Sequence, residues 1–200
     1  VEQLMLHKTM GKGEAKNISI DMLKRVGIAD AEKRFNQYAF ELSGGMRQRA
    51  MIAMALSTMP KLLLADEPTT ALDVTIQAQV INLMKDIIKE FNMGVIFITH
   101  DLGVIAQVAD DVAVMYLGSV VERGPVNDIL KNPKHPYTRG LLNALPDINN
   151  LDAPLKPIPG NIPSPLDRPT GCVFRTRCPD PTHECKEGSI EMGLIEVSPG

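Results

Sequence analysis

The pattern of apolar positions predicts a helix, a short strand, a longer helix and a second strand in succession. A helix is expected over residues 43–58, with Ser43 as its cap. Residues 62–65 form an unbroken apolar run, which is typical of a strand buried on both faces of a parallel sheet. The longer helix begins after Asp73, and residues 95–98 form a second buried strand. This order predicts a βαβ unit with parallel strands.

Both helices carry apolar residues at 3.6-residue spacing, so their core-facing positions can be predicted. In the first helix these positions are Met46, Ala50, Ala53, Met54 and Leu56. In the second they are Ile76, Val80, Leu83, Met84, Ile87, Ile88 and Phe91. The fold class is therefore α/β, with a parallel sheet.

The remaining segments give weaker patterns. Residues 1–41 alternate short helical patterns with breakers, and a helix is expected over 101–109. Strands over 112–116 and 120–122 flank Leu117-Gly118-Ser119, which indicates a hairpin. Seven of the fifteen prolines fall within residues 146–171, so irregular structure is expected there.

These changes in apolar pattern and in composition divide the chain into three predicted parts. A helical part spans residues 1–60, a strand-containing core spans 61–124, and an extension with the proline-rich linker and a cysteine cluster spans 125–200.

Composition excludes some classes of function. The chain has 200 residues, 44% of them hydrophobic and 22% charged, with a net charge of -3. This acidic balance gives no reason to expect nucleic-acid binding. No apolar run approaches the roughly 18 residues of a membrane span, and no secretory leader is evident. The three cysteines are clustered and odd in number, so a disulfide framework is not expected and the cytosol is the default compartment.

The first candidate for chemistry is the run Leu42-Ser43-Gly44-Gly45-Met46-Arg47-Gln48. A capping serine followed by two glycines leaves backbone N–H groups uncovered at the positive end of a helix, which suits a phosphate. A cap on a flexible turn is the alternative, because such tripeptides are common in loops.

The second and third candidates lie at the ends of the two strands. Asp66 and Glu67 follow the first strand, and Thr99 and His100 follow the second. Ligands collect at the carboxyl ends of parallel strands, where one acid can hold Mg²⁺ and the other can orient or deprotonate a water. The alternatives are a solvated strand end and a structural histidine.

These motifs, in this order and with Ala71-Leu72-Asp73 between the strands, closely resemble those of the ABC ATPase family. The resemblance implies part of a P-loop NTPase core with a parallel sheet and a helical subdomain, followed by an irregular C-terminal extension. It also implies ATP and Mg²⁺ as cofactors, with Asp66 in the Mg²⁺ shell, Glu67 as the general base, Asp73 coupling the two sites of a dimer, and His100 sensing the γ-phosphate. The signature residues, which would bind ATP held by the opposite subunit, are Leu42, Ser43, Gly44, Gly45 and Gln48.

One family feature is absent from the sequence. A phosphate-cradling loop of the form G-x-x-x-x-G-K-[ST] does not occur. Gly11-Lys12-Gly13 lacks a preceding apolar strand and a following Ser or Thr. The family's loop glutamine, which joins the nucleotide site to the membrane partner, is also absent, because Gln3 lies on a predicted helix. We therefore expect an N-terminally truncated fragment that neither binds ATP well nor hydrolyses it alone.

The C-terminal segment narrows the resemblance. Residues 132–142, Asn-Pro-Lys-His-Pro-Tyr-Thr-Arg-Gly-Leu-Leu, resemble the extension of oligopeptide and dipeptide import ATPases, although a Pro-broken turn before a short helix is the local alternative. Residues 157–160 and 171–178 continue the resemblance.

Cys172, Cys178 and Cys185 have the spacing C-x5-C-x6-C, which matches neither common zinc sites nor the tight ferredoxin run. The family resemblance implies a fourth cysteine beyond a Pro-Gly like Pro199-Gly200, and a possible [4Fe-4S] cluster in the full-length protein. His183 could substitute for it in a zinc site, and reduced thiols on a mobile tail are the alternative.

The resemblance implies an ATP-hydrolysing subunit of a peptide importer at the cytoplasmic face of the membrane. Its partners would be a second ATPase subunit, integral-membrane permease subunits and, indirectly, an extracytoplasmic substrate-binding protein. Two alternatives stay open at this point. One is an ABC-type ATPase of DNA repair or chromosome organisation, although only 22 residues separate Ser43 from Asp66, where such proteins place long insertions. The other is a non-enzymatic remnant that acts as an interaction or metal-binding module.

Overall fold

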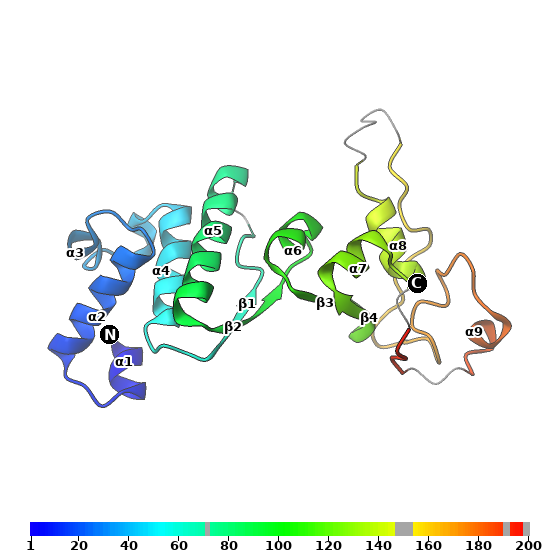
Figure 1. Ribbon diagram of the computed structural model, residues 1–200, viewed down its shortest axis with the longest axis horizontal. Helices are drawn as coiled ribbons and strands as arrows, with labels where there is room; N and C mark the ends of the chain where they lie inside the picture. Colours follow the sequence, from blue (N-terminus) through cyan, green and yellow to red (C-terminus); the bar gives the residue numbers. More distant parts are fainter. Residues whose placement is uncertain (71–72, 147–153, 190–192, 198–200) are drawn as a thin grey trace. The chain divides into compact units, whose positions relative to one another are not determined.

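The computed structural model describes residues 1–70, 73–146, 154–189 and 193–197. These residues form two compact units, Val1–Val104 and Ile105–Gly200 (Figure 1). Three predicted features fall wholly or partly outside the described residues: the pair Ala71-Leu72, residues 147–153 of the proline-rich stretch, and Pro199-Gly200. The predicted division at residues 60 and 124 stays a prediction.

The first unit is mainly helical before its first strand. Its elements, in chain order, are α1 (Glu2–His7), α2 (Lys12–Arg25), α3 (Ala31–Arg34), the 3₁₀ turn η1 (Ala39–Glu41), α4 (Gly44–Leu56), β1 (Leu62–Asp66), α5 (Val74–Phe91) and β2 (Gly94–Ile98). Helix α6 (Leu102–Val108) follows β2. The predicted strand–helix–strand order is therefore confirmed.

Helix α4 begins where the sequence predicts it. The hydroxyl of Ser43 accepts a hydrogen bond from the backbone N–H of Met46 at 3.3 Å, which satisfies one of the free donors of the first turn. Ala53 and Leu56 are buried as predicted, together with Ile52. The prediction for Met54 was wrong, because its side chain is 62% exposed. The turn of the helix brings Ile52 to the core and Met54 to the surface.

Helix α5 is also capped as predicted. A carboxylate oxygen of Asp73 accepts from the backbone N–H of Ile76 at 2.9 Å. Asn92 ends the helix in a left-handed conformation, with φ of 46°. The core-facing stripe is confirmed and includes one position that was not predicted, Ile81. The buried residues of the helix are Val80, Ile81, Met84 and Ile87.

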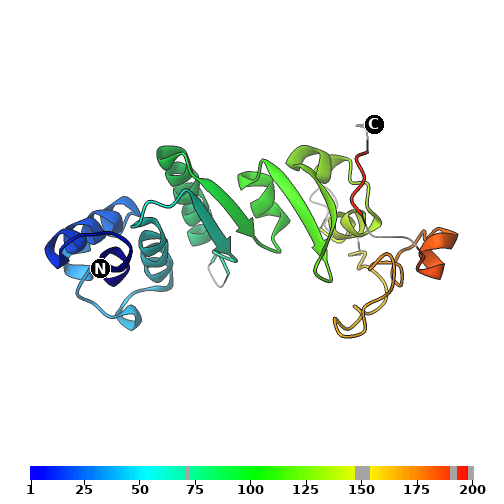
Figure 2. The ribbon, with the colours of Figure 1, turned by 90° about the horizontal axis from the view of Figure 1, so that it is seen from below.

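Strands β1 and β2 pair in parallel, with Leu62 opposite Gly94 and Asp66 opposite Ile98. Alternate residues of the two strands point to opposite faces of the sheet. One face packs against α5 and the core of the unit, through Leu63, Ala65, Val95 and Phe97 (Figure 2).

The other face of the β1–β2 sheet is open in the described structure. Four of its apolar side chains, Leu62, Leu64, Ile96 and Ile98, are each at least 50% exposed. The prediction that both strands are buried on both faces was therefore wrong for this chain. The continuous apolar run is present, but only α5 and its neighbours supply a layer against it.

The second unit is built on the predicted hairpin. Strands β3 (Asp111–Tyr116) and β4 (Ser119–Pro125) pair antiparallel, and Leu117 and Gly118 form the turn with φ of 45° and 74°. Positive φ at both turn positions gives a twist that matches the strands. Helices α7 (Val126–Lys131), α8 (Pro136–Asn143) and α9 (His183–Glu187) follow.

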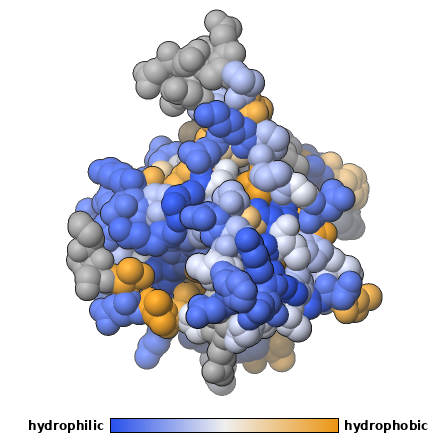
Figure 3. All heavy atoms as spheres, turned by 90° about the vertical axis from the view of Figure 1, so that its right-hand side faces the viewer, coloured by the Kyte–Doolittle hydropathy of each residue, from blue (hydrophilic) through white to orange (hydrophobic). Residues whose placement is uncertain are grey.

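The C-terminal segment packs onto this hairpin. Phe174 is 1% exposed, and its ring meets the ring of Tyr116 edge-on at 5.3 Å. The guanidinium of Arg177 donates to the carbonyl oxygens of Ile158 and Pro159 at 3.0 and 2.9 Å. These contacts hold part of residues 154–182, a described stretch that contains neither helix nor strand. Figure 3, which faces this unit, shows mainly hydrophilic surface with separate hydrophobic spots.

No helix within the described part of the chain is both long enough and apolar enough to cross a membrane.

Candidate functional site

Asp66, Glu67 and His100 lie at one end of the β1–β2 sheet, where Glu67 contacts His100. The backbone N–H of Glu67 donates to the carbonyl oxygen of Ile98 at 2.9 Å, which extends the pairing beyond Asp66. His100 lies two residues after Ile98. Because the strands are parallel and in register, their carboxyl ends bring Glu67 and His100 to the same edge.

The side chain of Glu67 is held at both oxygens. Its Oε1 lies 2.9 Å from Nδ1 of His100, and its Oε2 accepts from the hydroxyl of Thr70 at 2.7 Å. These contacts lower the pKa of Glu67, the hydrogen bond from Thr70 first and the one with His100 second. The carboxylate is therefore the favoured form, as a proton acceptor requires.

The backbone at Glu67 adopts an unusual conformation. Its φ is 44°, in the left-handed region that residues other than glycine seldom adopt. The turn that follows is closed by a hydrogen bond from the N–H of Thr70 to the carbonyl oxygen of Glu67 at 3.1 Å. Such conformations persist where surrounding contacts enforce them, and they often occur at functional sites.

Helix α4 contributes one of those contacts. The side-chain amide of Gln48 donates to the carbonyl oxygen of Pro68, in the turn after Glu67. Gln48 lies on the second turn of α4, five residues after the cap Ser43. The signature segment and the acidic strand end are thus joined by a direct hydrogen bond.

The starts of α4 and α5 also lie close together. A Cβ atom placed on Gly45 would come within 3.0 Å of Cγ2 of Ile76, on the first turn of α5. A Cβ on Gly44 would meet nothing within 4 Å, so this position is open on the outer side of the helix start. The first N–H groups of a helix have no partner inside it, so they are available to an anion there.

Asp66 ends β1 with an exposed side chain. Alternation along β1 puts it on the open face with Leu62 and Leu64, and its side chain is exposed. Mg²⁺ is commonly bound by one or two carboxylates, together with substrate phosphates and water, so a single exposed carboxylate fits this ion. Asp73, in contrast, uses its carboxylate to cap α5.

Three residues of the site were missed by sequence reasoning: Thr70, Gln77 and Asp101. The side chain of Gln77 donates to Asp101 at 3.0 Å, and Asp101 also accepts from the N–H of Gly103 at 2.8 Å. Burial raises the pKa of Asp101, but these hydrogen bonds outweigh it and leave the pKa lowered. Asp101 thereby fixes the start of α6 directly after His100. The Asp at a helix start was a usable signal, whereas the contacts of Thr70 and Gln77 depend on the fold.

The segment Gly11-Lys12-Gly13 forms no phosphate loop. Gly11 caps α2, which begins at Lys12, and the element before it is the helix α1. A phosphate loop of this class connects a strand to a helix.

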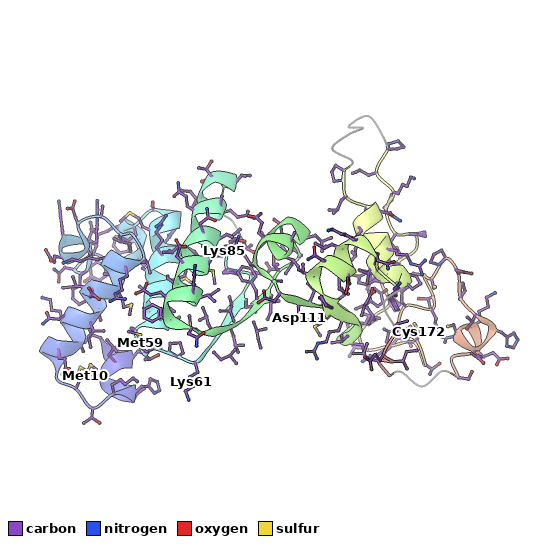
Figure 4. The ribbon with its side chains drawn as sticks, in the orientation of Figure 1. Met10, Met59, Lys61, Lys85, Asp111 and Cys172 are labelled. Atoms are coloured by element: carbon purple, nitrogen blue, oxygen red, sulfur yellow. The ribbon has the colours of Figure 1, made fainter. Side chains whose placement is uncertain are left out.

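The described residues give the cysteines no complete metal site. Burial raises the pKa of the Cys178 thiol, and the neighbouring Cys172 and Cys185 add to the effect. Cys185 accepts a hydrogen bond from Thr182, and Cys172, labelled in Figure 4, is a free thiol. The exposed His183 lies 3.6 Å from Glu187. Across residues 1–70, 73–146, 154–189 and 193–197, no group of three or more His, Cys, Asp or Glu side chains is placed to hold a metal ion. The predicted [4Fe-4S] cluster and the zinc alternative with His183 therefore have no support in these residues.

Comparison with known proteins accounts for both ends of the chain. Residues 2–70 match the ABC transporter family, and residues 121–185 match the oligopeptide/dipeptide transporter C-terminal region. The chain belongs to the ATP-binding proteins of oligopeptide/dipeptide ABC transporters. The predicted family and the partial P-loop NTPase fold are thereby confirmed.

Individual relatives agree with this assignment. The chain is 52% identical over 200 residues to the oligopeptide transport ATP-binding protein OppD of Salmonella typhimurium, covering 100% of this chain and 59% of that protein. It is 52% identical over 184 residues to the oligopeptide transport ATP-binding protein AppD of Bacillus subtilis, covering 92% and 56%. Among solved structures, CbiO1 of Clostridium perfringens, part of the ABC transporter complex CbiONQ, is 29% identical with a TM-score of 0.54 over 62% of this chain and 48% of that one. The chain thus spans less than two thirds of the length of these curated relatives.

Proposed function

We propose that this chain is part of an ATP-hydrolysing subunit that drives the import of oligopeptides or dipeptides through a membrane permease. The observation that carries the proposal is the pairing of Glu67 with His100 at the end of the parallel strands, linked through Pro68 to Gln48 of the signature helix. The family match supports the choice of transport. Nothing in the comparisons favours DNA repair or a non-enzymatic remnant.

The proposed reaction is the hydrolysis of ATP to ADP and phosphate. Glu67 accepts a proton from a water, whose oxygen forms a bond to the γ-phosphorus as the bond to the β–γ bridging oxygen breaks. His100 lies beside the same carboxylate and contacts the γ-phosphate. Positioning and charge stabilisation dominate in phosphoryl transfer, so the fixed geometry of these groups is their main contribution. Asp66 would hold Mg²⁺, and the ion would supply neutralisation of the phosphate charge.

The signature residues Leu42 to Gly45 serve a nucleotide held by a second subunit. The open side of Gly44 supports this, because nothing in the described part of the chain covers the helix start there. Gln48 connects this surface to the turn that carries Glu67, and Asp73 lies at the adjacent start of α5. A nucleotide bound at the signature can therefore influence the base through one helix.

The open face of the β1–β2 sheet supports a larger ATPase core. Leu64 is 64% exposed, although a strand of a parallel sheet with an unbroken apolar sequence is normally buried on both faces. We assign this face to the remaining half of the nucleotide-binding domain, which carries the phosphate loop in the complete subunit. On this proposal the 200-residue chain alone does not hydrolyse ATP.

The permease partner is proposed to contact the helical part of the first unit. A hollow of about 470 Å³ lies among α1, α2 and the residues after α4, away from Glu67 and His100. Met10 and Met59, labelled in Figure 4, line it together with Leu4, Ile18 and Met22. Because most of its lining side chains are apolar, with Lys8 and Asp21 as the charged ones, the hollow suits an amphipathic segment of the permease. The subunit would therefore lie at the cytoplasmic face of the membrane.

The proposal contains no iron–sulfur cluster, because no group of three or more metal-ligating side chains is placed to hold a metal ion among the described residues.

Vesicle transport tests the proposed function. The complete subunit and its permease are reconstituted with a peptide-binding protein, and uptake of labelled dipeptides and longer peptides is measured with and without ATP. ATP-dependent uptake of peptides is expected. Hydrolysis without uptake of any peptide would contradict the assignment of the cargo, and the absence of hydrolysis would contradict the assignment as an ATPase.

A further inference from the structure

The carboxylate of Glu67 has two partners of different kinds. Oε1 faces His100 at 2.9 Å, and Oε2 accepts from the hydroxyl of Thr70 at 2.7 Å. Sequence reasoning gave Thr70 no role, and its hydroxyl is not needed for the acid–base chemistry itself. Its contribution must therefore come from what it does to Glu67.

Backbone contacts fix the position of the Thr70 hydroxyl. The N–H of Thr70 donates to the carbonyl oxygen of Glu67 at 3.1 Å, which closes the turn, and the neighbouring Thr69 is only 7% exposed. Gln48 holds the same turn through Pro68. Backbone and side chain of Thr70 thus bind the same residue, which limits rotation of the carboxylate.

We propose that Thr70 is a positioning residue for Glu67, whose hydroxyl holds Oε2 and so leaves Oε1 directed toward His100 and the attacking water. This inference rests on the proposed ATPase function. Because Thr70 donates to the carboxylate, it also favours the charged form, which is the form that can take a proton. His100 supplies the second contact, so the two residues fix the carboxylate plane from opposite ends.

The test compares Thr70→Val with Thr70→Ser in the complete ATPase subunit assembled with its permease. Valine keeps the branched shape and removes the hydroxyl, whereas serine keeps the hydroxyl. Thr75→Val is the matched control, since Thr75 is exposed on α5 and does not contact Glu67. The turnover number kcat and the KM for ATP are measured for each protein.

For Thr70→Val we expect kcat to fall by roughly tenfold to a hundredfold with KM for ATP unchanged, because a misplaced catalytic group affects the reaction more than binding. Thr70→Ser should restore kcat, and Thr75→Val should match the parent protein. A Thr70→Val variant with unchanged kcat would overturn the inference, as would a Thr70→Ser variant that behaves like valine.

A second measurement separates this inference from the proposed function. NMR relaxation of the Glu67 side chain in the full chain reports its mobility and needs no ATP hydrolysis. Greater mobility in Thr70→Val than in the parent and in Thr70→Ser supports the role of the hydroxyl even if hydrolysis is not found. Equal mobility in all three proteins would overturn it even if the subunit is an active ATPase.

Discussion

The Nδ1 atom of His100 lies 2.9 Å from Oε1 of Glu67, although 33 positions separate the two residues in the chain. They meet because β1 and β2 pair in parallel and in register, and each residue follows the end of its strand. The contact requires no element outside the first unit. This pairing gives the candidate site its basic geometry, and the surrounding contacts can be tested one at a time.

His100→Ala should lower the rate of ATP hydrolysis by the complete subunit by about a hundredfold, a typical contribution from a positioned side chain in acid–base chemistry. Nucleotide binding should persist. The measurement is kcat for ATP, with binding followed by a fluorescent ATP analogue. His183→Ala is the control, because this side chain is 83% exposed on α9 in the second unit. Equal losses in both variants would contradict a specific role for His100.

Gly45→Ala should destabilise the contact between α4 and α5, whereas Gly44→Ala should not. The new Cβ at residue 45 would come within 3.0 Å of Ile76, and overpacking of this kind typically costs about 1–3 kcal/mol. Alanine at residue 44 meets nothing within 4 Å and has the better helix propensity, worth up to about 1 kcal/mol. Hydrogen exchange of the α4 and α5 amides reports the local opening free energy.

The double variant Gly45→Ala, Ile76→Ala identifies the cause. Removal of the Ile76 side chain makes room for the new Cβ, so the double variant should be less destabilised than the sum of the two single variants. Additive losses would show that the close approach to Ile76 is not responsible.

Gln48→Ala should loosen the turn after Glu67. It removes the hydrogen bond to the carbonyl oxygen of Pro68, and one such bond contributes about 1 kcal/mol. Amide exchange at Thr70 should become faster, and ATP hydrolysis by the complete subunit should fall. Arg47→Ala, an exposed position on the same helix, is the control. If both variants left the exchange at Thr70 unchanged, the link between α4 and this turn would carry no stability.

Acid should lower the free energy of unfolding of the second unit, because His135 becomes protonated. Its Nδ1 accepts from the N–H of Tyr137 at 3.1 Å and caps α8, a role that only the unprotonated nitrogen can fill. Burial lowers the pKa of His135; Glu122 partly opposes this and Arg139 reinforces it. Because the folded pKa lies below the unfolded value of about 6.5, the stabilisation is complete above that pH and is lost as the pH falls toward the folded pKa.

The free energy of unfolding should therefore decline between pH 8 and pH 5 more steeply in the parent chain than in His135→Asn, whose amide oxygen can cap α8 without titrating. Near-UV circular dichroism of the tyrosines follows this unit, since Tyr116 and Tyr137 lie in its core and the chain has no tryptophan. Parallel pH curves for the two proteins would contradict the role of His135.

Local pattern was sufficient to predict the parts of the fold that depend on nearby residues. Ser43 and Asp73 cap the expected helices, and the turn at Gly118 lies where the hairpin was expected. Burial was predicted less well, because exposure of Leu64 and Ile96 depends on which element covers the far face of the sheet. A run of apolar letters carries no information on that point.

The candidate site shows the same division. Glu67 and His100 could be placed together from strand order alone, since parallel strands end at one edge. The bond from Gln48 to Pro68 and that from Thr70 to Glu67 depend on a backbone with φ of 44° at Glu67, which no propensity rule predicts. The family resemblance, and not the cysteine spacing, implied a metal, and no group of three or more His, Cys, Asp or Glu side chains among the described residues is placed to hold one.

The most direct test of the proposed function is the rate of ATP hydrolysis by the complete subunit carrying Glu67→Gln. The amide keeps the size of the side chain and cannot accept the proton of the attacking water. Hydrolysis should be lost while ATP binding persists, so that a dimer with ATP retained accumulates and is seen by size-exclusion chromatography with bound-nucleotide analysis. Turnover at the rate of the parent protein, with no dimer retained, would contradict the assignment of Glu67 as the general base.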